Sequence, residues 1–244
     1  MIEARLLTKS FRDRRRGAIN AVSEVSFTCQ PGKVFGLLGP NGAGKTTTLR
    51  LISTALRPTS GTALVDGIDV AANPAGVRTR IGFLSANTGL YGRLTAREVL
   101  RYFGRLNGME KEPLETRIAD LAVLFDLGAF LDRPCDKLST GMKQRVNIAR
   151  TVVHDPPVLI LDEPTAGLDV LSSRTIVTFI RTQRDAGKTI LFSTHIMPDV
   201  ERLCDTVGII HQGRLFYEGT LDGLRERHGE DLEDAFVRMV TAAA

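Results

Sequence analysis

Short apolar runs alternate with helix-like stretches along much of the chain. Residues 34–38 and 158–161 are apolar almost throughout, a further strand is predicted over 189–194, and segments with helical spacing lie between them. Near-continuous apolar runs of this length are typical of strands buried on both faces of a parallel sheet. Their alternation with helices predicts an α/β fold built on such a sheet.

The N-terminal part has a different pattern. Residues 2–8, 21–22 and 25–28 alternate between apolar and polar positions, as half-buried antiparallel strands do. Farther along, residues 62–65 and 68–70 flank Asp66-Gly67, which predicts a β-hairpin. We therefore expect an antiparallel β subdomain beside the parallel sheet.

Residues 95–125 have helical periodicity and begin with a capping box formed by Thr95 and Glu98. Their apolar positions mark two apolar faces, the first made of Val99, Leu100, Tyr102, Phe103 and Leu106 and the second of Leu114, Ile118, Leu121 and Phe125. This block predicts a helical subdomain, about 87–137, inserted in a main domain of residues 1–220. A C-terminal helical extension, 221–244, should contain an amphipathic helix over 230–243, with Leu232, Phe236 and Val240 on one side.

The composition is that of a globular protein that buries a sizeable core. The chain has 244 residues, of which 43% are hydrophobic and 25% are charged. No apolar run is long enough to span a bilayer, and residues 1–5 do not form a signal peptide. We therefore expect no integral membrane role, while a peripheral one stays open.

Charge and cysteine content add two expectations. The net charge of +4 is too small to favour a nucleic-acid partner, and the basic residues 12–16 fit a solvated hairpin tip between two strands. Cys29, Cys135 and Cys204 are isolated and odd in number. This usage favours unpaired thiols in a reducing compartment over disulfides or a metal site.

The segment after the first apolar run carries the clearest chemistry. Gly39, Gly44, Lys45 and Thr46 have the spacing of a phosphate-binding loop, with a predicted strand before them and a helix after them. In such a loop the backbone amides enclose phosphates, the lysine contacts the β- and γ-phosphates, and the threonine hydroxyl ligates Mg²⁺. A glycine-rich turn followed by a surface lysine is the plain alternative, which the flanking elements disfavour. The predicted nucleotide contacts are Gly39, Pro40, Asn41, Gly42, Ala43, Gly44, Lys45, Thr46 and Thr47.

Two carboxylates end the second apolar run. Residues 158–161 are followed by Asp162 and Glu163, at the end of a parallel strand where ligands of such sheets bind. Asp162 is expected to hold Mg²⁺, directly or through water, and Glu163 to polarise the water that attacks the γ-phosphate. A chance Asp-Glu pair would be unremarkable alone, but it is disfavoured beside a phosphate loop.

A third motif, Leu138-Ser139-Thr140-Gly141-Met142-Lys143-Gln144, precedes another helical stretch. Here the sequence resembles the ATP-binding cassette of ABC transporters, whose signature has the form L-S-x-G-x-x-Q. The resemblance covers about residues 2–219 and implies a P-loop NTPase core of the RecA-like type. In that family the signature serine binds ATP held by a second cassette, so Ser139 and Gly141 are expected to complete a partner's site.

Three further positions match the family one at a time. Asp169, in Ala166-Gly167-Leu168-Asp169, resembles the aspartate that contacts the opposite cassette, although a helix-capping role would explain it too. His195 stands where the family has a histidine that senses the γ-phosphate; a lone histidine is otherwise usually structural. Phe11 stands where an aromatic ring stacks on adenine, and a core position is its alternative.

One position departs from the family pattern. Residues 85–88 lack the glutamine that normally reaches Mg²⁺ and joins the core to the helical subdomain, and Asn87 is a shorter substitute. The departure concerns coupling between the lobes and leaves ATP binding unaffected. Residues 36–42, 88–91, 199–205 and 231–236 resemble exporter cassettes of the sodium and drug efflux class.

The resemblance implies an ATPase subunit that binds ATP and Mg²⁺ and pairs with a second cassette, identical or related. It would drive a separate transmembrane permease from the cytoplasmic face of the membrane, and the permease would select the cargo. One rival is an ABC-type ATPase that acts on nucleic acid or ribosomes, although two fused cassettes or a coiled-coil insertion would then be usual. A GTPase or a kinase is the other, but the chain has no N-K-x-D run and no evident acceptor site.

Overall fold

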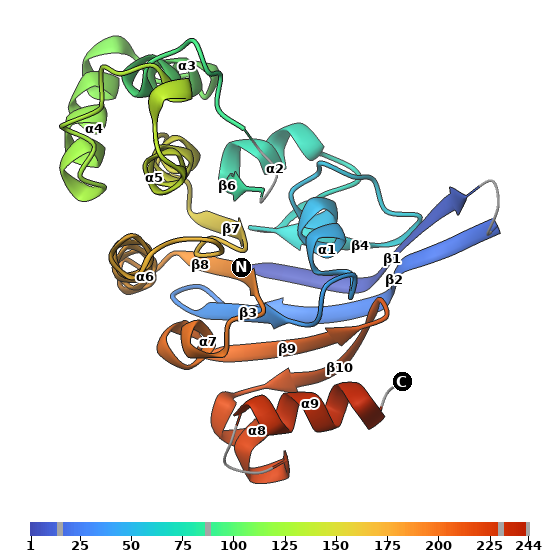
Figure 1. The fold of residues 1–244 in the computed structure, drawn as a ribbon. Helices are drawn as coiled ribbons and strands as arrows, with labels where there is room; N and C mark the ends of the chain where they lie inside the picture. The colour runs from blue at the N-terminus through green and yellow to red at the C-terminus, as the bar shows by residue number, and fades with distance from the viewer. Residues whose placement is uncertain (14–16, 86–88, 229–231, 243–244) are drawn as a thin grey trace.

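The computed structural model describes residues 1–13, 17–85, 89–228 and 232–242 (Figure 1). A six-stranded sheet has the order β10-β9-β3-β8-β7-β6. Its strands are β3 (Val34–Leu38), β6 (Ile81–Leu84), β7 (Val158–Asp162), β8 (Thr189–Thr194), β9 (Thr206–His211) and β10 (Arg214–Gly219). All of them are parallel except β10, which pairs with β9 in the antiparallel sense. Every residue of β3, β7 and β8 is buried, which confirms the predicted parallel sheet.

A four-stranded antiparallel sheet, in the order β2-β1-β4-β5, lies beside the first sheet. Its strands are β1 (Ile2–Asp13), β2 (Gly17–Cys29), β4 (Ser60–Val65) and β5 (Ile68–Asp69). The predicted antiparallel subdomain is therefore confirmed, although β1 and β2 are longer than the pattern indicated. Most of the basic segment, residues 14–16, for which a hairpin tip was predicted, lies outside the described residues.

Helices cover the six-stranded sheet and extend above it as a second lobe (Figure 1). Those nearest the sheet are α1 (Lys45–Ile52), α2 (Pro74–Arg80), α6 (Val170–Asp185) and α7 (Met197–Leu203). We call α3 (Ala96–Leu106), α4 (Lys111–Leu124) and the 3-10 helix η1 (Cys135–Lys137) the helical lobe. Helix α5 (Thr140–Thr151) packs on α3 and joins this lobe to the sheet. The helical lobe falls within the predicted insertion.

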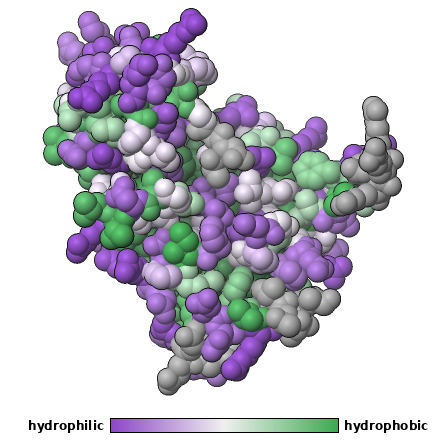
Figure 2. All heavy atoms as spheres, in the orientation of Figure 1, coloured by the Kyte–Doolittle hydropathy of each residue, from purple (hydrophilic) through white to green (hydrophobic). Residues whose placement is uncertain are grey.

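The two apolar faces predicted for the helical lobe are covered to different extents. The capping box is present and the whole α4 face, Leu114, Ile118, Leu121 and Phe125, is buried. On α3, however, Tyr102 is 49% exposed and Leu106 is 67% exposed. Helical periodicity identifies residues that share a face, but it does not show whether another element covers that face. Figure 2 shows a mostly hydrophilic surface at the top of this lobe, with hydrophobic groups lower down.

The C-terminal extension forms two helices, α8 (Leu221–His228) and α9 (Leu232–Ala242), which lie against β9 and β10 (Figure 1). Leu232 is buried there and Phe236 packs against the same cluster, as the amphipathic pattern predicted. Helix α9 is described from Leu232, because residues 229–231, where the predicted start falls, lie outside the described part, as does the side chain of Val240. Among the described residues, no helix is both long and apolar enough to cross a bilayer.

The three cysteines are unpaired, as predicted. Cys29 and Cys135 are buried, and Cys204 is half-buried. Burial raises the pKa of the Cys29 thiol to about 12 and also raises the pKa values of the other two. Thiols held in the protonated form are poor nucleophiles, so these cysteines contribute to packing rather than to chemistry.

Candidate active site

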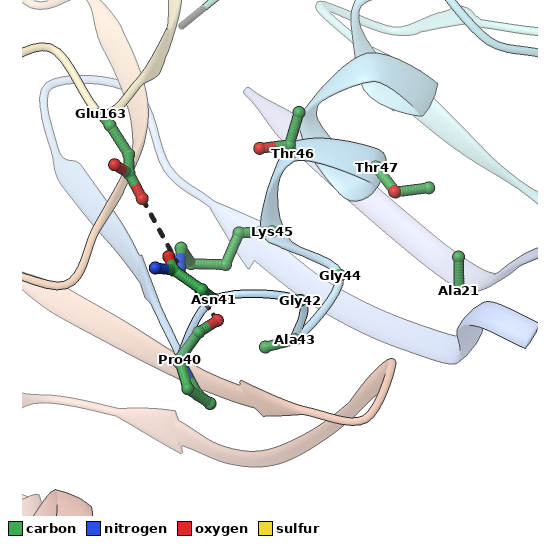
Figure 3. Close-up of a pocket in the computed structure, with 10 residues that line it drawn as sticks. All are labelled: Ala21, Pro40, Asn41, Gly42, Ala43, Gly44, Lys45, Thr46, Thr47 and Glu163. Atoms are coloured by element: carbon green, nitrogen blue, oxygen red, sulfur yellow. Dashed lines mark hydrogen bonds and ion pairs between the residues drawn. The ribbon is translucent and has the colours of Figure 1, made fainter.

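The phosphate loop connects the buried strand β3 to helix α1 and lines a small pocket of about 170 Å³ (Figure 3). Residues 40–47 line the pocket together with Ala21 and Glu163. Gly42 and Gly44 have φ angles of 81° and 109°, which side chains rarely allow. Helix α1 starts without a side-chain cap and without an acidic residue in its first turn, so its first amides are available to an anion.

Lys45 is 5% exposed and lies between the loop and Glu163 (Figure 3). Its Nζ donates hydrogen bonds to the carbonyl oxygens of Gly39, at 2.6 Å, and Pro40, at 3.2 Å. It also lies 3.7 Å from Glu163 Oε1. Burial lowers the pKa of Lys45, and the carboxylate of Glu163 partly offsets this effect. The geometry thus places a cation beside the amides that can hold phosphate.

The turn between β9 and β10 holds the back of the phosphate loop. The amide of Gly213 donates to the carbonyl of Ala43 at 2.8 Å, and the carbonyl of Gly213 accepts from the amide of Ser23 at 2.7 Å. Gly213 has a φ of 77°, and a Cβ at this position would lie 2.9 Å from the carbonyl oxygen of Ala21. The turn therefore needs glycine both for its conformation and for its closeness to β2.

We expect Gly213→Ala to weaken ATP binding about tenfold, because the displaced turn would release Ala43 and loosen the amide cradle. Isothermal titration with ATP measures this change. Gly67→Ala is the matched control: Gly67 has a φ of 79° but nothing within 4 Å of the added Cβ. It should cost about 1 kcal/mol in the free energy of unfolding and leave ATP affinity unchanged. Equal ATP affinity in the two variants would contradict the role of the turn.

Asp162 ends β7 below the loop and is fully buried. Its Oδ1 accepts hydrogen bonds from the hydroxyls of Thr46, at 3.2 Å, and Ser193, at 2.7 Å. Its Oδ2 is buried and has no hydrogen-bond partner within the described residues. A buried carboxylate oxygen normally has a partner, and Mg²⁺ prefers oxygen ligands beside a phosphate. The donor set therefore fits the Mg²⁺ that the sequence predicted.

Glu163 follows Asp162 and turns its carboxylate toward the pocket (Figure 3). Its backbone has a φ of 49°, in the left-handed region. The Nδ1 of His195 lies 3.2 Å from Glu163 Oε1. Glu163, Lys45 and His195 are thus brought together as the sequence predicted, and the carboxylate has one cationic neighbour and one imidazole neighbour.

The predicted partner-facing residues form a separate group that does not line this pocket. Ser139 caps α5 by accepting from the amide of Met142, and Asp169 caps α6 by accepting from the amide of Ser172. A Cβ on Gly141 would lie 3.6 Å from Asp169 Oδ2, so the starts of the two helices adjoin. The helix-capping role considered for Asp169 is therefore confirmed. Its contact with a second cassette stays a prediction.

Phe11 lies on β1 and is 42% exposed, which excludes the core alternative. The Nζ of Lys9 lies 5.3 Å from its ring centroid. Phe11 is not among the residues that line the pocket, so its contact with adenine stays a prediction. Residues 86–88, where the family glutamine would stand, lie outside the described part.

Sequence reasoning missed three contributors to this site. Ala21 lines the pocket, Ser193 contacts Asp162, and the side-chain amide of Gln144 donates to the carbonyl of Pro164 at 2.9 Å. Gln144 was visible in the signature motif, although its partner was not. Neither Ala21 nor Ser193 belongs to a motif, and Ser193 reaches the site through the pairing of β8 with β7.

Fold and site together define a P-loop nucleoside triphosphatase. Residues 22–166 match the family described as ABC transporter. The chain is 45% identical to the ABC transporter ATP-binding protein NatA of Bacillus subtilis (strain 168), over 94% of each chain. It is 36% identical to the probable multidrug ABC transporter ATP-binding protein YbhF of Escherichia coli (strain K12), over 98% of this chain but only 42% of that protein.

The fold also matches a solved dimeric structure of the ATP-binding cassette MJ0796, in a post-hydrolysis state bound to ADP and Pi. The TM-score is 0.84 and the identity is 26%, over 91% of this chain and 99% of that one. The chain belongs to the ABC transporter family and is an ATP-binding, ATP-hydrolysing subunit. Nothing in these comparisons favours the nucleic-acid alternative.

Proposed function

We propose that the chain is one of two cassettes that close on ATP, hydrolyse it and separate, and that they thereby drive a separate transmembrane permease. The observation that carries this proposal is the division of the predicted site. The phosphate loop and Glu163 line one pocket, and Asp162 accepts a hydrogen bond from Thr46 of that loop. Ser139 and Asp169 lie instead at two helix starts outside the pocket. The dimeric MJ0796 cassette supports a second subunit, which is either an identical copy or a related one.

Within one cassette the described residues divide the work of an in-line attack by water. The loop amides and Lys45 bind the β- and γ-phosphates and stabilise charge in the transition state. Thr46 and Asp162 would hold Mg²⁺, which when bound supplies further positive charge beside the phosphates. Glu163 orients the attacking water and accepts its proton, while His195 holds the Glu163 carboxylate in place.

The second cassette would complete the site with its own copies of Ser139 and Gly141. A serine hydroxyl and the free amides at the start of α5 form an anion site that suits a γ-phosphate. The first turn of α5 itself contains no acidic residue. Asp169, whose helix start adjoins this anion site, would contact the opposite subunit.

The helical lobe offers a docking surface for the permease. A groove of about 700 Å³ lies between the lobe and the sheet, and its walls include Phe83, Phe103 and Leu106. Arg150 lines the same groove and is 6% exposed, and among the described residues it has no carboxylate partner. An apolar groove with a buried guanidinium suits a permease segment that carries apolar side chains and a carboxylate.

Leu106→Asp should lower recovery of the chain with its permease about tenfold or more, because a carboxylate in the groove opposes apolar contact. The measurement is co-purification with the transmembrane permease when the two are produced together. Val123→Asp, at a side chain that is 84% exposed on α4, is the control and should leave recovery unchanged. Both variants should hydrolyse ATP normally. Equal recovery of both would contradict the docking surface.

We propose an exporter that works from the cytoplasmic face of the cell membrane. The support comes from the efflux-type motifs and from the multidrug transporter named among the relatives. The permease would choose the cargo, because the described pocket suits only a nucleotide phosphate.

A further inference from the structure

The hydroxyl of Ser193 connects the two carboxylate-bearing residues at the end of β7. Ser193 is fully buried on β8, and the strand register places it directly beside Asp162. Its Oγ donates to Asp162 Oδ1 at 2.7 Å and accepts from the amide of Glu163 at 3.1 Å. A serine hydroxyl has one donor, so its proton is committed to Asp162.

The bond to Asp162 fixes which carboxylate oxygen remains available. Oδ1 is occupied by Ser193 and Thr46, while Oδ2 is buried and has no partner in the described part of the chain. A carboxylate held through one oxygen cannot rotate freely about its χ2 angle. Without the Ser193 hydroxyl, Thr46 alone would hold it, through a longer bond of 3.2 Å.

The hydrogen bond from the Glu163 amide to Ser193 stabilises an unfavourable backbone conformation. Glu163 has a φ of 49°, a conformation that residues with side chains seldom adopt. Its amide donates both to the carbonyl oxygen and to the Oγ of Ser193, each at 3.1 Å. The same serine therefore stabilises the backbone that directs the Glu163 carboxylate into the pocket.

We infer that Ser193 is a positioning residue for the Mg²⁺ site. Its hydroxyl orients the Asp162 carboxylate toward the metal and holds the backbone of Glu163 in place beside Asp162. This inference rests on the Mg²⁺ role proposed for Asp162. Neighbours that orient a metal ligand typically contribute 10–100-fold in metal affinity or activity when they are removed. Ser193 touches neither nucleotide nor metal in this scheme and acts through the two carboxylates.

The test separates Mg²⁺ dependence from nucleotide binding. Ser193→Ala should raise the Mg²⁺ concentration for half-maximal ATP hydrolysis about tenfold. It should also lose most of the gain in ATP affinity that Mg²⁺ gives, as measured by equilibrium dialysis with and without EDTA. ATP affinity in EDTA should match that of the wild type, which also shows that the variant is folded. Ser193→Cys, which fills the space with a weaker donor, should shift in the same direction and decides the matter if the alanine variant does not fold.

Ser53→Ala is the matched control. Ser53 is 4% exposed at the end of α1, and its hydroxyl donates to the carbonyl of Arg50. It should leave the Mg²⁺ response unchanged. A wild-type Mg²⁺ response in the Ser193 variants, or an equal shift in Ser53→Ala, would overturn the role of Ser193. A wild-type protein that ignores Mg²⁺ would instead refute the proposed metal site.

Discussion

Glu163→Gln is expected to slow ATP hydrolysis by about 10²–10⁴-fold and to leave ATP affinity within about twofold of the wild type. Glutamine keeps the size of the side chain but can neither accept a proton nor carry charge. The Glu163 carboxylate lies 3.7 Å from the Lys45 ammonium and 3.2 Å from the His195 imidazole. Residue 163 lies outside the phosphate loop, so its backbone amide is not one of those that bind phosphate. Hydrolysis should therefore fail while binding persists.

The same variant should accumulate as a closed dimer with ATP, because separation follows hydrolysis in the proposed cycle. Gel filtration with and without ATP measures this change. Glu201→Gln is the control, at an exposed α7 side chain that forms an ion pair with Arg225. This variant should hydrolyse ATP normally and should not accumulate as a closed dimer. Normal turnover by Glu163→Gln, together with a monomer in the presence of ATP, would refute both the role of Glu163 and the cycle.

Mixing two inactive variants should restore hydrolysis if the partner's serine completes each site. Lys45→Ala and Ser139→Arg should each lose about 100-fold or more when assayed alone, since each removes a contact to the γ-phosphate. In a mixed pair, one ATP site contains both substitutions and the other ATP site contains neither. With random pairing, half of the dimers are mixed and each of these has one intact site, so the mixture should recover up to about a quarter of wild-type activity.

Lys45→Ala mixed with Glu163→Gln is the control for this experiment. Both of these lesions lie in the same pocket, so a mixed pair has no intact site and should show no recovery. Absence of recovery in the first mixture, or hydrolysis at full rate by an isolated single copy, would show that Ser139 does not act across the pair.

The sequence predicted the parts of the site that are local in the chain. The spacing of Gly39, Gly44 and Lys45 and the position of Asp162 after an apolar run were sufficient, because a loop between a strand and a helix has few geometries. The parallel sheet, the antiparallel subdomain and the capping box were also predicted, because each leaves a local pattern of apolar, polar or capping residues in the sequence. The limits of the inserted subdomain and the roles of the partner-facing residues stay predictions.

Contacts between distant segments could not be predicted. Ser193 meets Asp162 through the register of β7 and β8, and Gly213 meets Ala43 through the pairing of β9 with β3. Strand order and register depend on packing of the whole sheet, which one sequence does not reveal. Leu106 shows the complementary limit, because its helical spacing gives its face but does not reveal that its side chain is left exposed.

Helix α5 makes the two ATP sites of the proposed pair mechanically inseparable. Its first turn begins at Ser139, which would contact the neighbour's nucleotide, while Gln144 holds the carbonyl of Pro164 next to Glu163 in the same subunit. These two residues are about 7.5 Å apart along a rigid helix. Any tilt of α5 caused by one nucleotide must therefore reach the other hydrolytic centre, and alternating or cooperative turnover would need no additional relay.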